Sequence, residues 1–181
     1  EAPDSPVDRY FGGRTLMTMD GEEHLELRRT LDAKYRPRAV SEYIDALVQP
    51  IADAYVAQLL AKPERSAELV TEYFEPISVL ALASTLGIGD MSAEHLQEWF
   101  YGLSQGAINF EDDPAKAAEC AATVDDIAKE LRPRMRTWQS EPDDSAIASM
   151  LTHGCPMGQP RSIESLMPVS YTHLRAHETR E

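Results

Sequence analysis

Cysteines and long apolar runs are both scarce in this sequence. Its 181 residues include two cysteines, Cys120 and Cys155, which are too far apart for a disulfide framework or a CxxC zinc site. No stretch approaches the roughly 20 consecutive apolar residues that a membrane helix needs, and no basic start followed by an apolar run indicates a signal peptide. We therefore expect a cytoplasmic protein with no membrane partner.

Positive charge is also sparse. The chain has 17 Lys and Arg against 31 Asp and Glu, a formal net charge of -14, which argues against nucleic acid as a partner because phosphate backbones are bound by clustered cations. One segment, Glu26 to Arg38, departs from this balance with five basic residues against two acidic ones. We call these five residues the basic island: Arg28, Arg29, Lys34, Arg36 and Arg38.

The alternating pattern of half-buried strands is missing, and apolar residues instead recur at helical spacing, which predicts a mainly α fold. Local start and stop signals place the helices. We expect helices over 21–33, from about 41 to the Lys62-Pro63 pair with a kink at Pro50, over 76–86, after Ser92, from Pro114 to about 138, around 147–151, and from Ser162 onward. The 76–86 helix is apolar almost all round, so it is expected in the core.

His24 and Arg28 are the candidate binding residues. They are four residues apart, so on a helix they project from one face and can reach one group together. Arginine offers a planar fork of donors and histidine a further N–H, which suits a carboxylate ligand. The spacing alone is more typical of an exposed face on which both side chains pair with Glu22, Glu23 or water.

A family resemblance extends this motif. The stretch Met19-Asp20-Gly21-Glu22-Glu23-His24, with Arg28 and the following Tyr35-Arg36-Pro37-Arg38, resembles the D-G-x-x-H-x-x-x-R signature of bacterial cytochromes P-450. ELVTEYFEPISVLALASTLGIGDMSAEHLQEWF is similar to the family's E helix and the entry to its F helix, and DDSAIASMLTHG with SIESL to the stretch from its H helix to the start of its I helix. The resemblance covers about residues 15 to 167.

The resemblance implies a partial cytochrome P-450 fold with bound haem b. His24 and Arg28 would then bind the haem propionates. Arg29, Lys34, Arg36 and Arg38 would contribute to a surface where a ferredoxin-like redox partner docks, although a solvated helix end explains each of these cations equally well. The implied activity is that of a haem-dependent monooxygenase, which inserts one atom of O2 into a small organic substrate.

The family pattern is incomplete in this sequence, because neither cysteine qualifies as the thiolate ligand of the iron. Cys120 lies in an Ala-rich helix, and Cys155 lacks the phenylalanine and glycines that the family places around its ligand. The E-x-x-R pair is also missing. We therefore expect residues 1–167 to be a partial cytochrome P-450 domain, truncated before the haem-ligand region, and residues 168–181 to be a foreign read-through tail.

We assign no catalytic residue and no metal ligand. The tail segment Ala176-His177-Glu178-Thr179 faintly resembles the family's oxygen-activating A-G-x-[DE]-T, but Arg175 beside it does not suit an apolar helix over a haem. Two alternatives to a haem enzyme fragment stay open. One is a cofactor-free helical binding or regulatory module, in which the basic island binds an acidic partner. The other is a non-functional truncated product.

Overall fold

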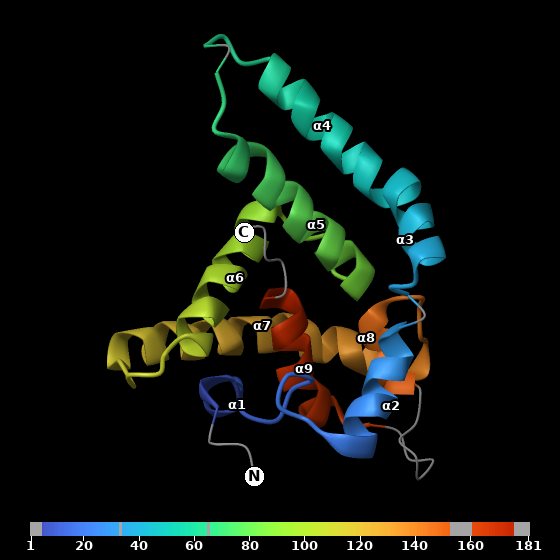
Figure 1. The fold of residues 1–181 in the computed structure, drawn as a ribbon, viewed down its shortest axis with the longest axis vertical. Coiled ribbons are helices and arrows are strands. Elements are labelled where there is room, and N and C mark those ends of the chain that lie inside the picture. The colour runs from blue at the N-terminus through green and yellow to red at the C-terminus, as the bar shows by residue number, and fades with distance from the viewer. Residues whose placement is uncertain (1–4, 33, 65, 153–160, 176–181) are drawn as a thin grey trace.

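The computed structural model describes residues 5–32, 34–64, 66–152 and 161–175. These residues form helices and turns, and no strand occurs among them. The predicted mainly α fold is confirmed. None of the helices in the described ranges is long and apolar enough to cross a membrane. Figure 1 shows the longest helix, α7, running behind α9, with α1 and α2 at one end of the molecule and α3, α4 and α5 at the other.

The first two helices flank the candidate motif. Helix α1, Pro6–Phe11, ends at Gly12, whose left-handed backbone (φ 77°) suits a residue without a Cβ. Helix α2, Gly21–Asp32, has Glu22 and Glu23 in its first turn, where carboxylates interact favourably with the positive end of the helix dipole. The described part of the predicted 21–33 helix is thus confirmed.

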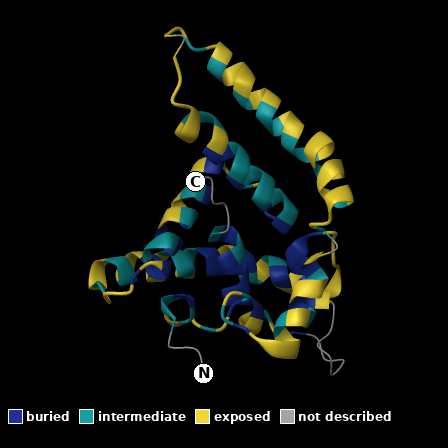
Figure 2. Ribbon diagram, viewed as in Figure 1, coloured by how far each residue is buried: buried dark blue, intermediate teal, exposed yellow. Residues whose placement is uncertain are grey.

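A long arm follows, made of α3 (Pro37–Tyr43), a π-helical segment η1 (Ile44–Val48) and α4 (Gln49–Leu60). The predicted start near Ser41 is wrong, because the fixed φ of Pro37 suits a first helical turn and begins the helix four residues earlier. The irregularity expected at Pro50 takes the form of the π segment just before it, as the missing N–H of proline disturbs the hydrogen-bond ladder. No residue of the arm is buried (Figure 2).

Helix α5, Glu75–Leu86, follows a second π-helical segment, η2 (Val70–Phe74). It ends at Gly87, which has a left-handed backbone (φ 92°) as the sequence predicts. Pro76, Val79, Ala83 and Leu86 are buried, while the other apolar residues of the helix are only partly covered. The expected core helix therefore has one fully buried face.

Helices α6 (Ala93–Ala107) and α7 (Pro114–Ser140) pack closely against each other. Both begin where the sequence predicts: the Ser92 side chain accepts a hydrogen bond from His95 N at 3.3 Å, and the Asp113 side chain one from Ala115 N at 2.8 Å. Gly102 and Gly106 of α6 face Thr123 and Cys120 of α7 with no room for a Cβ. The apolar stripe of α7 is buried at Ile127, Ala128, Leu131, Met135 and Trp138.

The last two helices, α8 (Ala146–Thr152) and α9 (Ile163–Arg175), complete the core. The sequence pattern predicts that the apolar face of α9 fails after residue 167, but the helix continues and buries Val169, Tyr171 and Leu174. Burial raises the pKa of Tyr171 to about 12. This packing does not bear on the origin of residues 168–181, which stays a prediction.

Candidate functional site

Helix α2 carries the candidate pair on the border of its buried face. Leu27 and Leu31 are buried and fix the helix against the core, where it packs on α8. His24 and Arg28 are one turn apart beside this apolar row, with His24 partly buried and Arg28 exposed. The helix therefore presents an imidazole and a guanidinium together at the edge of the core.

Neither side chain is committed to a strong partner. The Arg28 Nε lies 3.6 Å from Asp32 Oδ1, beyond hydrogen-bond distance, and both side chains are more than half exposed. No hydrogen bond or ion pair joins His24 to another residue in the described ranges. Glu23, which the sequence offers as a partner for the pair, lies instead 3.5 Å from Arg14 Nη1. The donors of His24 and Arg28 are thus free to bind a ligand.

Lys34 does not belong to an exposed basic surface, so its predicted role in partner docking is wrong. Its side chain is 11% exposed, and its ammonium group lies 2.6 Å from Asp144 Oδ1 and also donates to the Asp144 carbonyl oxygen. This contact ties the end of α2 to the turn before α8. Arg28, Arg29, Arg36 and Arg38 of the basic island are exposed.

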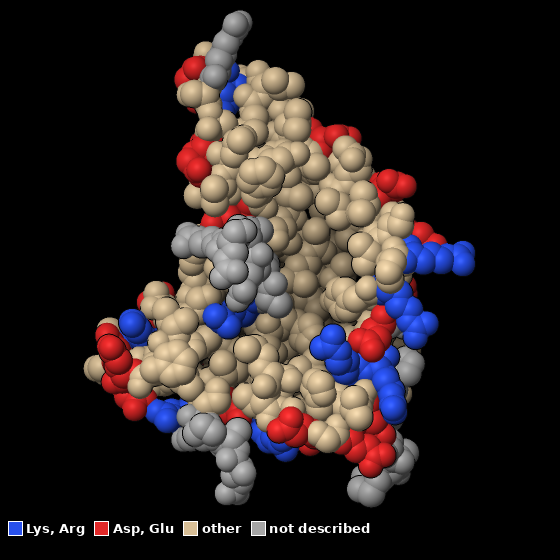
Figure 3. Space-filling model, in the orientation of Figure 1, with Lys and Arg blue, Asp and Glu red and all other residues tan. Residues whose placement is uncertain are grey.

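The face drawn in Figure 3 has a hollow between α5 and the α3–α4 arm, lined by residues without charge. Positive side chains gather over α2 and α3 at the edge of this hollow. Walls without charge and cations at the border suit a ligand whose body is uncharged and which carries carboxylates at one end.

Cys120 cannot act as a thiolate ligand. It is fully buried in α7, and its sulfur faces the backbone of Gly106 in α6. Burial raises the pKa of the Cys120 thiol, which favours the protonated form. Cys155 lies outside the described residues. Within the described ranges there is also no group of three His, Cys, Asp or Glu side chains that could hold a metal ion.

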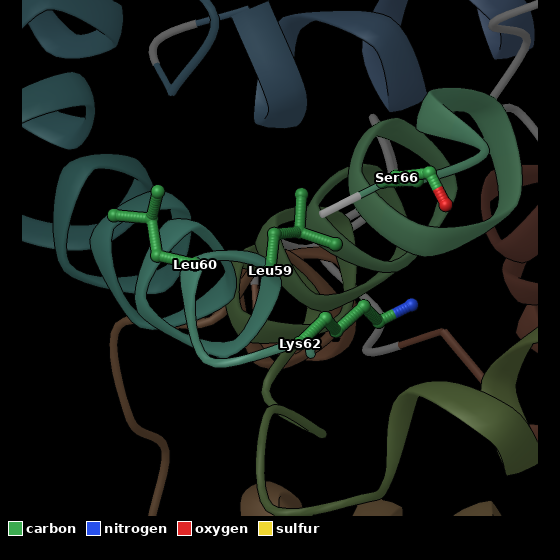
Figure 4. Close-up of a pocket in the computed structure, with 5 residues that line it drawn as sticks. Leu59, Leu60, Lys62 and Ser66 are labelled. Atoms are coloured by element: carbon green, nitrogen blue, oxygen red, sulfur yellow. The ribbon is translucent and has the colours of Figure 1, made fainter. Parts of the chain in front are cut away.

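A cavity of about 440 Å³ lies far from this pair, at the turn between α4 and η2. Figure 4 shows Leu59 and Leu60 leaving the end of α4 in different directions, with Lys62 below them. Lys62 Nζ is 2.5 Å from Glu72 Oε2, which closes the turn. The lysine is therefore engaged in a local ion pair, and no group among the described lining residues suggests chemistry.

Comparison with solved structures identifies the fold. A cytochrome P-450 in complex with an acyl carrier protein that carries hexadec-9Z-enoic acid matches 98% of the chain with a TM-score of 0.77 at 15% identity. A mutant of the cytochrome P-450 EryK in complex with erythromycin B matches 96% with a TM-score of 0.74 at 23% identity. The chain has part of the cytochrome P-450 fold. The predicted resemblance is thus confirmed at the level of the fold.

Two further comparisons involve Sorangium cellulosum So ce56. A cytochrome P-450 structure from this organism matches 91% of the chain with a TM-score of 0.70 at 22% identity. The C-19 steroid 1alpha-hydroxylase of the same organism is 42% identical to this chain over 48 residues, which are 26% of this chain and 12% of the hydroxylase. No family model matches the chain. The chain spans less than half the length of each of the three solved structures: 44% of the acyl carrier protein complex, 44% of EryK and 41% of the Sorangium cellulosum protein.

Within this partial cytochrome P-450 fold, the two members of the candidate pair fit the carboxylates of a haem. His24 and Arg28 are donors on one helix face, they lack strong partners, and they lie beside the buried Leu27 and Leu31. Their assignment to the propionates stays a prediction. Of the two methionines before α2, Met19 is a buried core residue and Met17 is exposed. Thr179 lies outside the described residues.

Proposed function

We propose that the chain is part of a haem-thiolate monooxygenase of the cytochrome P-450 family, with His24 and Arg28 binding the propionates of haem b. The observation that carries this proposal is the pair itself: two uncommitted donors on α2, inside a partial cytochrome P-450 fold. An arginine at such a position binds a carboxylate through parallel N–H donors, and a histidine gains charge beside an anion.

In the proposed enzyme, α2 binds and orients the cofactor while α8 and the Lys34–Asp144 contact keep the end of α2 in place. Haem b with a thiolate ligand would supply the activation of O2. One oxygen atom would go to a small organic substrate, and the other would be reduced to water with two electrons from the redox partner and two protons. The ligating cysteine would come from sequence outside these 181 residues.

The test is the gene downstream of the codon for Met167. We expect an open reading frame that encodes E-x-x-R and then F-x-x-G-x-x-x-C-x-G, and a full-length protein whose reduced carbon monoxide complex gives the absorption band of thiolate-ligated haem. A long reading frame with neither motif would overturn the monooxygenase. A soluble full-length protein that does not take up haem would favour the cofactor-free helical module instead.

We propose in addition that an acidic redox partner docks over α2 and α3, at Arg29, Arg36 and Arg38. All three are exposed, and Arg38 has only a loose contact of 3.4 Å with Glu42. Clustered exposed cations accelerate the association of an acidic protein, and the effect weakens as salt rises. Lys34 takes no part, because Asp144 holds it.

Reversing one charge of this surface should slow electron delivery. For Arg36→Glu in the full-length enzyme, we expect the association rate with an acidic ferredoxin at low salt to fall on the order of tenfold, with a shallower salt dependence. Lys129→Glu on α7 makes the same change of charge at another exposed position and should leave the rate nearly unchanged. Equal losses in both variants, measured by stopped-flow reduction, would contradict docking at this surface.

A further inference from the structure

A second cavity, of about 210 Å³, lies between the start of α9 and the loop that joins α1 to α2. Figure 1 shows these two segments next to each other. At roughly 30 Å³ for each water molecule, the volume would hold about seven waters or one small organic molecule. Its lining includes Arg14, Met19, Glu23, Arg161 and Glu164.

Arg161 is unusual among these lining residues. It is 7% exposed, and its Nε is buried without a hydrogen-bond partner. No ion pair links it to any residue in the described part of the chain. Arg161 therefore brings a guanidinium to the wall of the cavity without an ion-paired partner among the described residues. Buried charges are normally paired, because an isolated one is costly.

The two acidic residues of the lining are already engaged by other arginines. Glu23 Oε2 lies 3.5 Å from Arg14 Nη1. Glu164 accepts two hydrogen bonds of 3.0 Å from Arg132 Nε and Nη2, and these bonds lower the pKa of the Glu164 carboxyl, so it stays ionised. With these pairs formed, Arg161 is the cation of the cavity that has no counter-charge.

From this imbalance we propose that the cavity binds a small monocarboxylate through Arg161. A carboxylate matches the planar fork of a guanidinium, and one negative charge balances one buried cation. A phosphate dianion would bring a second negative charge, and with Glu23 and Glu164 already paired no further cation of the lining balances it. The buried side chain of Met19 and the ring of Pro168 provide apolar surface for a short alkyl tail. The site is separate from His24 and Arg28 and does not depend on haem.

Butyrate is a suitable probe, used with the full-length protein and compared with phosphate at matched ionic strength. Isothermal titration should detect saturable binding of butyrate that is tighter than binding of phosphate. Arg161→Met should weaken butyrate binding by at least roughly tenfold, the usual effect of losing a charge-assisted hydrogen bond. Lys129→Met, at an exposed cation of α7, should change it by less than about twofold.

The stability of the unliganded variants separates a binding site from a structural role. Because Arg161→Met removes an unbalanced buried charge and keeps apolar bulk, we expect its melting temperature without butyrate to equal or exceed that of the unmodified chain. Butyrate should then raise the melting temperature of the unmodified chain but not of Arg161→Met. A less stable Arg161→Met variant, an absence of saturable binding, equal butyrate affinity in both variants, or tighter binding of phosphate would each overturn the proposal.

Discussion

Replacing Gly102 by alanine should destabilise the protein by about 3 kcal/mol, at the upper end of the usual cost of overpacking. A Cβ at this position of α6 would lie 1.9 Å from Thr123 Oγ1 and 2.8 Å from Thr123 Cβ. Rotation of Thr123 can relieve the contact with its hydroxyl but not the one with its Cβ, so α6 and α7 must separate. Urea unfolding followed by circular dichroism measures the loss.

Moving the glycine to the other helix provides the control. Thr123→Gly alone should cost about 1 kcal/mol or less, through helix propensity. In the double variant Gly102→Ala/Thr123→Gly, the alanine on α6 faces a glycine on α7. The two helices can then approach as closely as before, with the glycine now on α7. We expect the double variant to be destabilised by less than about 2 kcal/mol, well short of the sum of the single effects. Strictly additive losses would mean that the Gly102–Thr123 contact does not limit the approach of the helices.

Loss of either member of the candidate pair should weaken haem binding by about 30-fold in the full-length protein. Removing one hydrogen bond to a charged group costs about 2 kcal/mol, which corresponds to this factor. We expect Arg28→Ala and His24→Ala each to show this loss, because each substitution removes a donor from the same helix face. Haem transfer to apomyoglobin, followed by absorption, measures the affinity.

Arg29→Ala is the matched control for this experiment. Arg29 has the same side chain, is exposed on the same helix and follows Arg28 directly, but it projects about 100° further round the helix. We expect its haem affinity to stay within about twofold of the unmodified protein. An equal loss in Arg28→Ala and Arg29→Ala would show that general positive charge, and not the geometry of the pair, governs haem retention.

The parts of the fold that the sequence predicts well depend on short-range signals. Ser92, Asp113 with Pro114, and Gly87 mark helix ends because a cap acts within a few residues of its own position. The D-G-x-x-H-x-x-x-R motif is equally local, and its helix is found where the motif predicts it. These signals can therefore be identified from the sequence without knowledge of the tertiary structure.

The parts that were missed depend on contacts between distant residues. In the sequence, Lys34 looks like one more surface cation of the basic island. Its contact with Asp144, 110 residues away, shows that it is held at the turn before α8. The continued burial of α9 beyond residue 167 likewise comes from neighbouring helices, since its own polar residues Ser170 and Thr172 bond back to carbonyl oxygens of the same helix. Nothing in the sequence around Arg161 signals that this arginine is buried without a partner.

The most direct measurement compares haem with its dimethyl ester, in which both propionates are uncharged, on the full-length protein and its Arg28→Ala variant. If the guanidinium of Arg28 binds a propionate, the substitution should lower the affinity for haem by about 30-fold and the affinity for the ester by less than about threefold. His24→Ala, compared in the same way, should also lower the affinity for haem more than the affinity for the ester. An equal loss for haem and ester would contradict the central claim, because Arg28 would then support the fold and not hold a carboxylate.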